Sequence, residues 1–207
     1  MESYLVPAGY GEAEYSDKKS RFIGQVSLAD SEDAAMAFVQ RVRAKYPDAA
    51  HNVWAYCLRS GEMRWSDDGE PGGTSGQPTL NVFRSAGVFD VCCVVTRYFG
   101  GTLLGSGGLV RAYSKAASMA LEAAGLARMA RWRKIRIGCG YPLYDKVRRL
   151  LADFGGEEIE AQFGREVWVS ALVPASRAAD FGARLTDVTA GSAVLNEESW
   201  IFRPARI

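Results

Sequence analysis

The sequence of 207 residues contains a single histidine, His51, and four cysteines with no C-x-x-C pair among them. Zinc sites and dithiol redox centres are built from clusters of these residue types, so the sequence offers no basis for either. All four cysteines lie inside apolar runs, and we expect buried thiols there because free cysteine packs as a small hydrophobe. We therefore expect neither a metal nor a cofactor.

Long hydrophobic segments are also missing. No stretch approaches the ~18 consecutive apolar residues of a membrane-spanning helix. The first residues, MESYLVPAGY, lack the basic head and apolar run of a secretion signal. Internal repeats and low-complexity segments are absent as well. We therefore expect a soluble cytoplasmic protein that makes no membrane contact.

The net charge of +1 conceals an uneven distribution. Residues 97–149 carry 11 Lys and Arg against 2 Asp and Glu, whereas the segments before and after them are net acidic. Such a basic block can supply the electrostatic footprint for an anionic partner, above all nucleic acid. The alternative is a solvated surface whose basic side chains meet acidic neighbours from elsewhere in the fold. Both interpretations stay open at this point.

The order of expected elements indicates two α+β domains. In the first part we expect strands at 21–29, 52–58, 62–65 and 88–96, and helices at 34–46, 79–85 and 109–124. In the second part we expect a strand at 133–139, a helix at 143–154, strands at 157–163 and 166–173, a helix at 175–188 and a strand at 193–202. The second series is the βαββαβ order of a ferredoxin-like domain. With a linker near 125–131, the expected domains are 1–127 and 131–207.

A glycine-rich stretch lies between the most apolar strand and the following helix. Such a loop, leading into a helix N-terminus, can receive a phosphate through backbone N–H groups and the helix dipole. The spacing matches neither the G-x-G-x-x-G fingerprint nor the Walker loop. A generic anion site remains, and glycines that permit a tight turn and close helix packing are the equal alternative. The candidate nucleic-acid or anion-binding residues are Arg97, Gly105, Ser106, Gly107, Gly108, Arg111, Lys115, Arg131, Arg133 and Lys134.

A second loop, SDDGEPGGTSGQP at residues 66–78, carries three carboxylates close together: Asp67, Asp68 and Glu70. These groups can hold a cation or act as acid and base, but the spaced ligands of a calcium loop are missing. Turn chemistry or contact with a partner explains the loop equally well. His51 is the only available base for a nucleophile such as Ser75 or Cys57, and a structural role is favoured for it. We assign no catalytic and no metal-binding residue.

These two loops together carry a family resemblance. Residues 66–78 and VVTRYFGGTLLGSGGLVRAYSKA at 94–116 resemble the YigZ/IMPACT family, whose signature Arg-aromatic-aromatic-Gly-Gly-x-x-Leu-Gly is here Arg97 to Gly105. The likeness covers about residues 15–125, and the remainder resembles the C-terminal domain of the bacterial YigZ branch. The motif-loop residues that the resemblance marks for a partner or ligand are His51, Asp67, Asp68, Glu70, Pro71, Thr74, Gly76, Pro78, Tyr98, Phe99, Gly100 and Gly101.

The resemblance implies an N-terminal domain like the second domain of ribosomal protein S-five, with a left-handed βαβ crossover against the usual hand. It also implies a domain pair like the fourth and fifth domains of elongation factor G. IMPACT proteins are translational regulators, so we expect a non-catalytic protein that acts near translation and contacts RNA or the ribosome through the basic block. Two alternatives stay open: a small-ligand or nucleotide-binding enzyme that uses the two glycine-rich loops, and a protein–protein interaction module.

Overall fold

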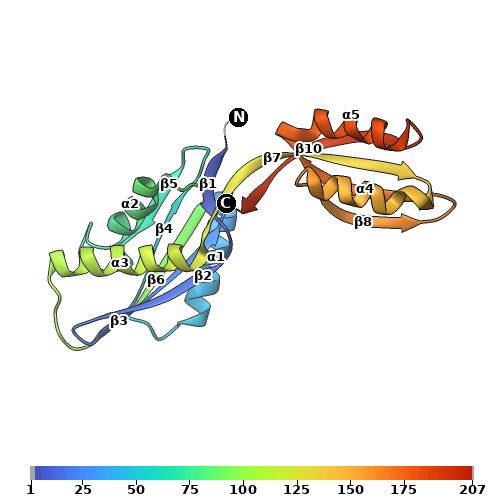
Figure 1. The fold of residues 1–207 in the computed structure, drawn as a ribbon. Helices are drawn as coiled ribbons and strands as arrows, with labels where there is room; N and C mark the ends of the chain where they lie inside the picture. Colours follow the sequence, from blue (N-terminus) through green and yellow to red (C-terminus); the bar gives the residue numbers. More distant parts are fainter. Residues whose placement is uncertain (1–2, 207) are drawn as a thin grey trace. The chain divides into compact units, whose positions relative to one another are not determined.

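The computed structural model describes residues 3–206, which form two compact units (Figure 1). The N-terminal unit comprises residues 4–128 with 204–206, and the C-terminal unit comprises residues 129–203 with residue 3. Among the described residues, no helix is long and apolar enough to cross a membrane. The α+β class expected from the sequence is confirmed, and each unit has its own core.

The N-terminal unit is built on an antiparallel sheet with the strand order β2-β3-β6-β4-β5. The strands are β2 (Gly11–Asp17), β3 (Ser20–Leu28), β4 (His51–Cys57), β5 (Met63–Ser66) and β6 (Val91–Tyr98). A further strand, β1 (Tyr4–Pro7), pairs with β7. Both β3 and β4 run antiparallel to β6, so they are parallel to each other and the chain crosses between them through α1 (Glu32–Lys45).

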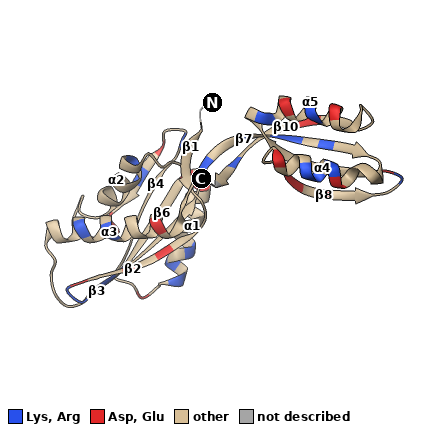
Figure 2. Ribbon diagram, viewed as in Figure 1, with Lys and Arg blue, Asp and Glu red and all other residues tan. Residues whose placement is uncertain are grey.

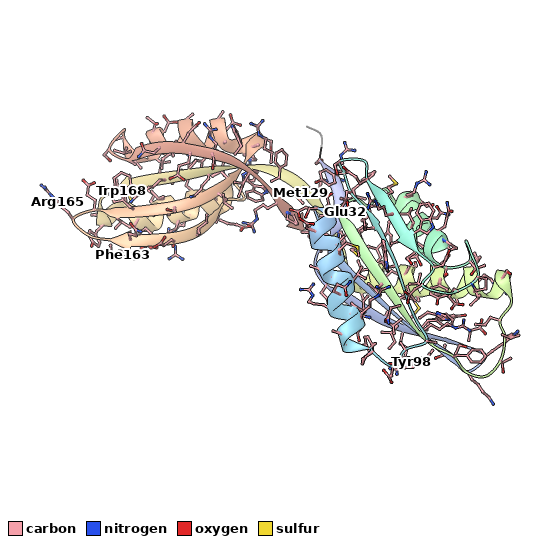
Figure 3. All side chains as sticks on the ribbon, turned by 180° about the vertical axis from the view of Figure 1, so that it is seen from behind. Glu32, Tyr98, Met129, Phe163, Arg165 and Trp168 are labelled. Carbon is pink, nitrogen blue, oxygen red and sulfur yellow. The ribbon has the colours of Figure 1, made fainter. Side chains whose placement is uncertain are left out.

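Helices cover both faces of this sheet. Alternate residues of a strand point to opposite faces. Cys93 and Val95 of β6 pack with α2 (Gly76–Ala86) and α3 (Ser106–Ala124), while Cys92 and Val94 pack with α1. Figure 3 shows α1, with Glu32 in its first turn, against the sheet. The N-terminal unit therefore has three layers.

The C-terminal unit has the expected ferredoxin-like order. Its elements are β7 (Leu126–Cys139), α4 (Tyr141–Asp153), β8 (Glu157–Phe163), β9 (Val167–Pro174), a short 3-10 turn (Ala175–Arg177), α5 (Ala178–Thr189) and β10 (Val194–Arg206). β7 pairs with both β9 and β10, and β8 pairs with β9. Both helices contribute to one core, in which Leu151 and Phe181 pack with Ile137 and Val169.

The structure differs from the expected elements in three places. The expected linker at 125–131 is mostly strand, because β7 begins at Leu126, and the two units divide within this range, between residues 128 and 129. The strands β1 and β2 are not among the elements expected from the sequence, and the inner positions of β2, which are Gly11, Ala13, Tyr15 and Asp17, form no continuous apolar stripe. α2 and α3 each begin three residues earlier than expected, at Gly76 and Ser106.

Small residues bring α3 directly onto the sheet. A Cβ atom on Gly24 of β3 would lie 2.3 Å from the carbonyl oxygen of Ala116, and one on Gly11 of β2 would lie 2.2 Å from the backbone nitrogen of Ala124. Both glycines are required by this close approach of backbone to backbone rather than by a turn. The position of α3, and of the loop before it, thus depends on these contacts.

We expect Gly24→Ala to lower the free energy of unfolding by about 1–3 kcal/mol or more, because the added methyl group overlaps backbone atoms of α3. Urea unfolding followed by circular dichroism measures the change. Gly72→Ala is the matched control, since a Cβ atom at Gly72 would meet no heavy atom within 4 Å. Equal stability of the Gly24→Ala variant and the control would contradict this account of α3 packing.

Candidate functional site

The two glycine-rich loops meet at one pocket of about 400 Å³ in the N-terminal unit. Its walls come from the start of β4, the end of β6 and the N-terminal turn of α3. The antiparallel register pairs His51 of β4 with Arg97 of β6, which brings residues from distant parts of the sequence together. The residues that line the pocket are His51, Gly69, Glu70, Pro71, Arg97, Phe99, Leu103, Leu104, Gly105, Ser106 and Leu109.

A buried ion pair between Glu70 and Arg97 forms the floor of this pocket. The two side chains are 3% and 6% exposed, and Arg97 Nη1 lies 2.6 Å from Glu70 Oε1. Tyr113 of α3 donates its hydroxyl proton to the same carboxylate at 2.7 Å. Burial, and next the bond to Glu70, raise the pKa of Tyr113 far above its ordinary value, so the phenol stays protonated. Ser20 Oγ accepts from Arg97 Nη2 at 3.4 Å and from the Gly100 N–H at 3.2 Å.

Arg97 is therefore not part of the exposed basic surface, contrary to the expectation that it binds phosphate. Its charge is already matched by Glu70 inside the protein. The guanidinium also lies 5.4 Å from the ring centroids of Phe22 and Phe99. A guanidinium enclosed in this way serves to hold the two loops together.

Asp67 organises the acidic loop from within. Its carboxylate accepts hydrogen bonds from the N–H groups of Gly73 at 2.8 Å, Ser75 at 3.1 Å and Gly76 at 2.8 Å, and from the Ser75 hydroxyl at 2.8 Å. Burial acts to raise the pKa of Asp67, but the bonds from Gly73, Gly76 and Ser75 outweigh it and the pKa is lowered. Because Ser75 immediately precedes α2, Asp67 caps this helix from a distance.

Asp68 and His51 connect the acidic loop to β4. Asp68 pairs with Arg43 of α1 at 2.6 Å and accepts the backbone N–H of Asn52 at 2.7 Å. The His51 Nδ1 atom lies 2.7 Å from the Asp68 carbonyl oxygen, which can only accept, so Nδ1 carries a proton. The Nε2 atom of His51 lies 4.0 Å from Glu70 Oε2 at the pocket wall.

The residues of a nucleophilic site do not come together. Ser75 Oγ donates to Asp67 rather than to His51. Cys57 lies at the opposite end of β4 from His51, and burial raises the pKa of its thiol. The carboxylates of Asp67, Asp68 and Glu70 each bind different partners within the protein. Among residues 3–206, no group of three or more His, Cys, Asp or Glu side chains could hold a metal ion.

The remaining motif residues support the two loops. Thr74 Oγ1 donates to the Pro71 carbonyl at 2.6 Å, and Tyr98 donates to Asp48 at 2.8 Å. Pro78 is buried in the first turn of α2, where a missing N–H is tolerated. A side chain on Gly76 would overlap Trp65 and Ser66.

Most glycines before α3 have a packing or conformational reason. A Cβ atom on Gly100 would lie 2.0 Å from the Lys19 backbone, and one on Gly108 would lie 3.0 Å from Leu104. Gly101 and Gly105 have positive φ angles of 81° and 72°. Gly107 has neither constraint. It lies exposed in the first turn of α3, where the nearest heavy atom to a Cβ would be Nη1 of Arg111 at 3.6 Å.

The basic block divides into paired and exposed groups. Arg133 and Lys134 of β7 pair with Glu197 and Glu198 of β10, the second pair at 3.1 Å. The guanidinium of Arg131 lies over the Trp200 ring at 4.0 Å. Acidic neighbours from elsewhere in the fold therefore neutralise Arg133 and Lys134.

On α3 the situation differs. Arg111 and Lys115 are exposed, and no ion pair involving either is found within the described part of the chain. Figure 2 shows Lys and Arg on α3 as well as on β7 and α4.

Sequence analysis does not identify two residues that support the ion pair between Glu70 and Arg97. Tyr113 follows Leu109 at helical spacing and is read as a core residue, and Ser20 is an isolated polar residue in a turn. Neither pattern reveals the hydrogen bonds to Glu70 and Arg97, because these partners lie far away in the sequence.

We expect Glu70→Gln to lower the free energy of unfolding by about 3 kcal/mol or more, because the substitution leaves the buried Arg97 charge without its partner. Urea unfolding at neutral pH measures the loss. Glu14→Gln is the matched control, since it breaks a Glu–Arg pair whose side chains are 47% and 51% exposed. If both variants were as stable as the parent protein, the buried pair would not hold the loops.

The lowered pKa of Asp67 predicts a pH-dependent contribution to stability. A carboxyl whose pKa is depressed by folding stabilises the protein above its unfolded pKa, here near 3.8, and this contribution is lost as the pH falls through the folded pKa. We expect Asp67→Asn to be destabilised by about 1 kcal/mol at neutral pH, as for a lost helix cap. The difference in the free energy of unfolding between the Asp67→Asn variant and the parent protein should become smaller below the unfolded pKa. Unfolding in urea across a pH series tests this, and a difference that stays constant with pH would contradict it.

Comparison with known proteins agrees with the division of the chain. Residues 18–121 match the Impact N-terminal domain, and residues 137–192 match a domain of unknown function (DUF1949). The chain is 38% identical over 196 residues to the IMPACT family member YigZ of Escherichia coli, covering 93% of this chain and 96% of that protein. It is 33% identical over 199 residues to the IMPACT family member YvyE of Bacillus subtilis, covering 95% and 92%. A crystal structure of a hypothetical protein is similar with a TM-score of 0.62 and 37% identity, covering 94% of this chain and 97% of that one. The chain therefore belongs to the IMPACT family.

Proposed function

We propose that this protein is a non-catalytic, cytoplasmic RNA-binding protein of translation that holds the RNA backbone at the N-terminal turn of α3. The RNA to which it binds is ribosomal RNA. The order of the two domains, which resembles the fourth and fifth domains of elongation factor G, supports this choice.

The observation that carries the proposal is the exposed start of α3. Gly105 occupies the N-cap position and provides no side-chain cap for this helix of 19 residues. Ser106 and Gly107 are exposed, and the Arg111 guanidinium lies beside Gly107. Backbone N–H groups at a helix N-terminus attract phosphate, and a guanidinium strengthens the contact through charge-assisted hydrogen bonds.

Neighbouring side chains extend this surface. Lys115 lies one helical turn after Arg111, and both residues border an open groove that Tyr15 and Val82 also line. On the other side, Phe99 is 51% exposed at the pocket, and its ring is positioned above Arg97. An exposed aromatic ring of this kind is a stacking platform for an unpaired RNA base. The backbone would thus follow α3 while a base contacts Phe99.

The cations of β7 in the C-terminal unit are a separate group and contribute less to binding. Arg133 and Lys134 already contact glutamates, so RNA must compete with these carboxylates. Arg131 is exposed and stacked on Trp200, and we include it as a secondary contact. Binding by phosphate contacts releases counterions, so the affinity should fall steeply as salt is raised.

We expect the protein to cosediment with ribosomes, and with free ribosomal RNA, at low salt and to dissociate as the salt concentration rises. The double substitution Arg111→Glu with Lys115→Glu should weaken binding by about tenfold or more and reduce the slope of log affinity against log salt by about 2. Phe99→Ala should lower affinity without changing the slope, because stacking involves no counterions.

Arg184→Glu is the control for the charge change. Arg184 is 60% exposed on α5 and lies outside the proposed surface. Salt-independent binding, or equal loss of binding in the Arg184→Glu protein and the α3 variant, would overturn the proposal.

A further inference from the structure

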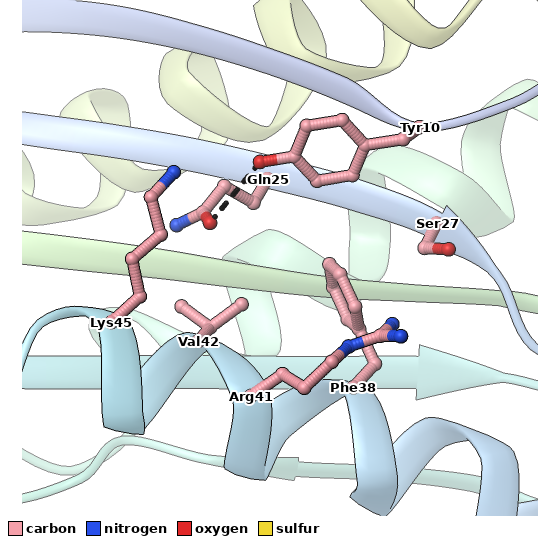
Figure 4. A pocket seen from close by; sticks show the side chains of 7 residues that line it. All are labelled: Tyr10, Gln25, Ser27, Phe38, Arg41, Val42 and Lys45. Atoms are coloured by element: carbon pink, nitrogen blue, oxygen red, sulfur yellow. Dashed lines mark hydrogen bonds between the residues drawn. The ribbon is translucent and has the colours of Figure 1, made fainter.

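A second groove lies on the other face of the sheet in the N-terminal unit. Its volume is about 540 Å³, and it is lined by Tyr10, Gln25, Ser27, Phe38, Arg41, Val42 and Lys45 (Figure 4). α1 contacts β6 and β4 and leaves the β2–β3 side of the same face open. The groove is therefore separate from the surface proposed for RNA, because α3 packs on the opposite face.

Gln25 places at this groove a buried amide whose hydrogen-bonding groups are not all satisfied. The residue is only 1% exposed, and its Nε2 atom has no hydrogen-bond partner. The amide oxygen lies 3.3 Å from the Tyr10 hydroxyl, which is also in short contact with the Glu12 carboxylate. Burial, followed by the bond to Glu12, raises the pKa of Tyr10 to about 12, so the phenol has one proton to donate.

That single proton cannot serve two acceptors. When Tyr10 donates to the charged carboxylate of Glu12, the amide oxygen of Gln25 receives nothing from it. Rotating the amide by half a turn lets Nε2 donate to the Tyr10 oxygen, but then Oε1 takes the position without a partner. In either orientation one end of the amide lacks a hydrogen bond. Buried polar groups in proteins are nearly always satisfied, so a ligand atom is the natural partner here.

The rim of the groove carries positive charge and aromatic surface. The guanidinium of Arg41 lies 5.4 Å from the Phe38 ring centroid, and none of the described residues forms an ion pair with it. Lys45, at the Gln25 end, pairs with Glu12 at 2.8 Å. The rings of Tyr10 and Phe38 are 6.4 Å apart in an edge-to-face arrangement. Figure 4 shows Arg41 in front of Phe38, with Tyr10 across the groove.

We propose that this groove binds a mononucleotide, with the base at Gln25 and Tyr10 and the phosphate at Arg41. Nucleobase edges carry adjacent donors and acceptors, so a base can pair with the glutamine amide in either orientation. Aromatic rings and guanidinium planes stack on bases, and a free guanidinium binds phosphate. The volume lies within the range of about 300–1,000 Å³ typical of small-molecule sites.

The side chains around the Gln25 amide allow a ligand to reach it. The ion pair of Lys45 with Glu12 lies next to Gln25, and its side chains are 51% and 36% exposed. Exposed ion pairs contribute little to stability, so a ligand can displace Lys45 from Glu12. The phosphate lies at the Arg41 end, away from the negative charge of Glu12.

Isothermal titration of the full-length protein with AMP, GMP, CMP and UMP tests the proposal. We expect at least one nucleotide to bind with a dissociation constant below about 1 mM and to raise the melting temperature. Inorganic phosphate and adenosine, used as separate probes, should each bind more weakly than AMP. Absence of binding by every nucleotide at this concentration would overturn the proposal.

Two variants locate the site. Arg41→Gln, at the exposed rim, should weaken nucleotide binding by about tenfold or more, because it removes a charge-assisted contact to phosphate. Gln25→Leu should abolish binding without destabilising the fold, since it removes an amide that lacks a partner. Nucleotide affinity unchanged in both variants would refute the assignment.

The same variants separate this site from RNA binding. Lys115→Gln, on α3, should leave nucleotide affinity unchanged, and Arg41→Gln should leave cosedimentation with ribosomes unchanged. Equal loss of both activities in Arg41→Gln would show that the groove is not a distinct nucleotide site. Nucleotide binding does not rest on the proposed RNA surface, so either can fail alone.

Discussion

The buried ion pair between Glu70 and Arg97 is the contact on which the pocket of the N-terminal unit depends. It joins the acidic loop before α2 to the end of the central strand β6. A buried ion pair stabilises a fold only when further hydrogen bonds satisfy its remaining atoms. Tyr113 of α3 supplies one such bond to the carboxylate, and Ser20 supplies an acceptor to the guanidinium, of which Nε has no partner. Two loops that are distant in the sequence thereby become the walls of one pocket.

Close packing of α3 against the sheet explains why so many glycines surround this helix. Gly11 and Gly24 let the alanine face of the helix approach the sheet backbone. Gly100 lets the loop pass the backbone at Lys19, and positive φ angles require Gly101 and Gly105. The same geometry leaves the first turn of α3 without a cap and exposed to solvent. A structural requirement thus creates the surface at which we propose that RNA binds.

A cluster of charged residues in the sequence need not form a charged surface in the folded protein. The basic block is divided by the fold: Glu70 neutralises Arg97 in the interior, and Glu197 and Glu198 reach the cations of β7 through strand pairing. Exposed cations of the block remain on α3, at Arg111 and Lys115, and also on β7 and α4. The two faces of the N-terminal sheet then offer different chemistry, with exposed cations on α3 and an unsatisfied amide beside α1.

The sequence by itself determined the kinds and order of most elements, because hydrophobic periodicity and turn residues act locally. The buried run of β6, the βαββαβ series of the second unit and the motif from Arg97 to Gly105 are all readable in this way. Only the tertiary structure decided that Arg97 is enclosed, that β2 lies beneath α3, and that Gln25 meets Tyr10. Periodicity records which side of an element is buried and carries no information about which distant residue covers it. Partners of charged and polar groups are therefore set by the register and packing of strands far apart in the chain.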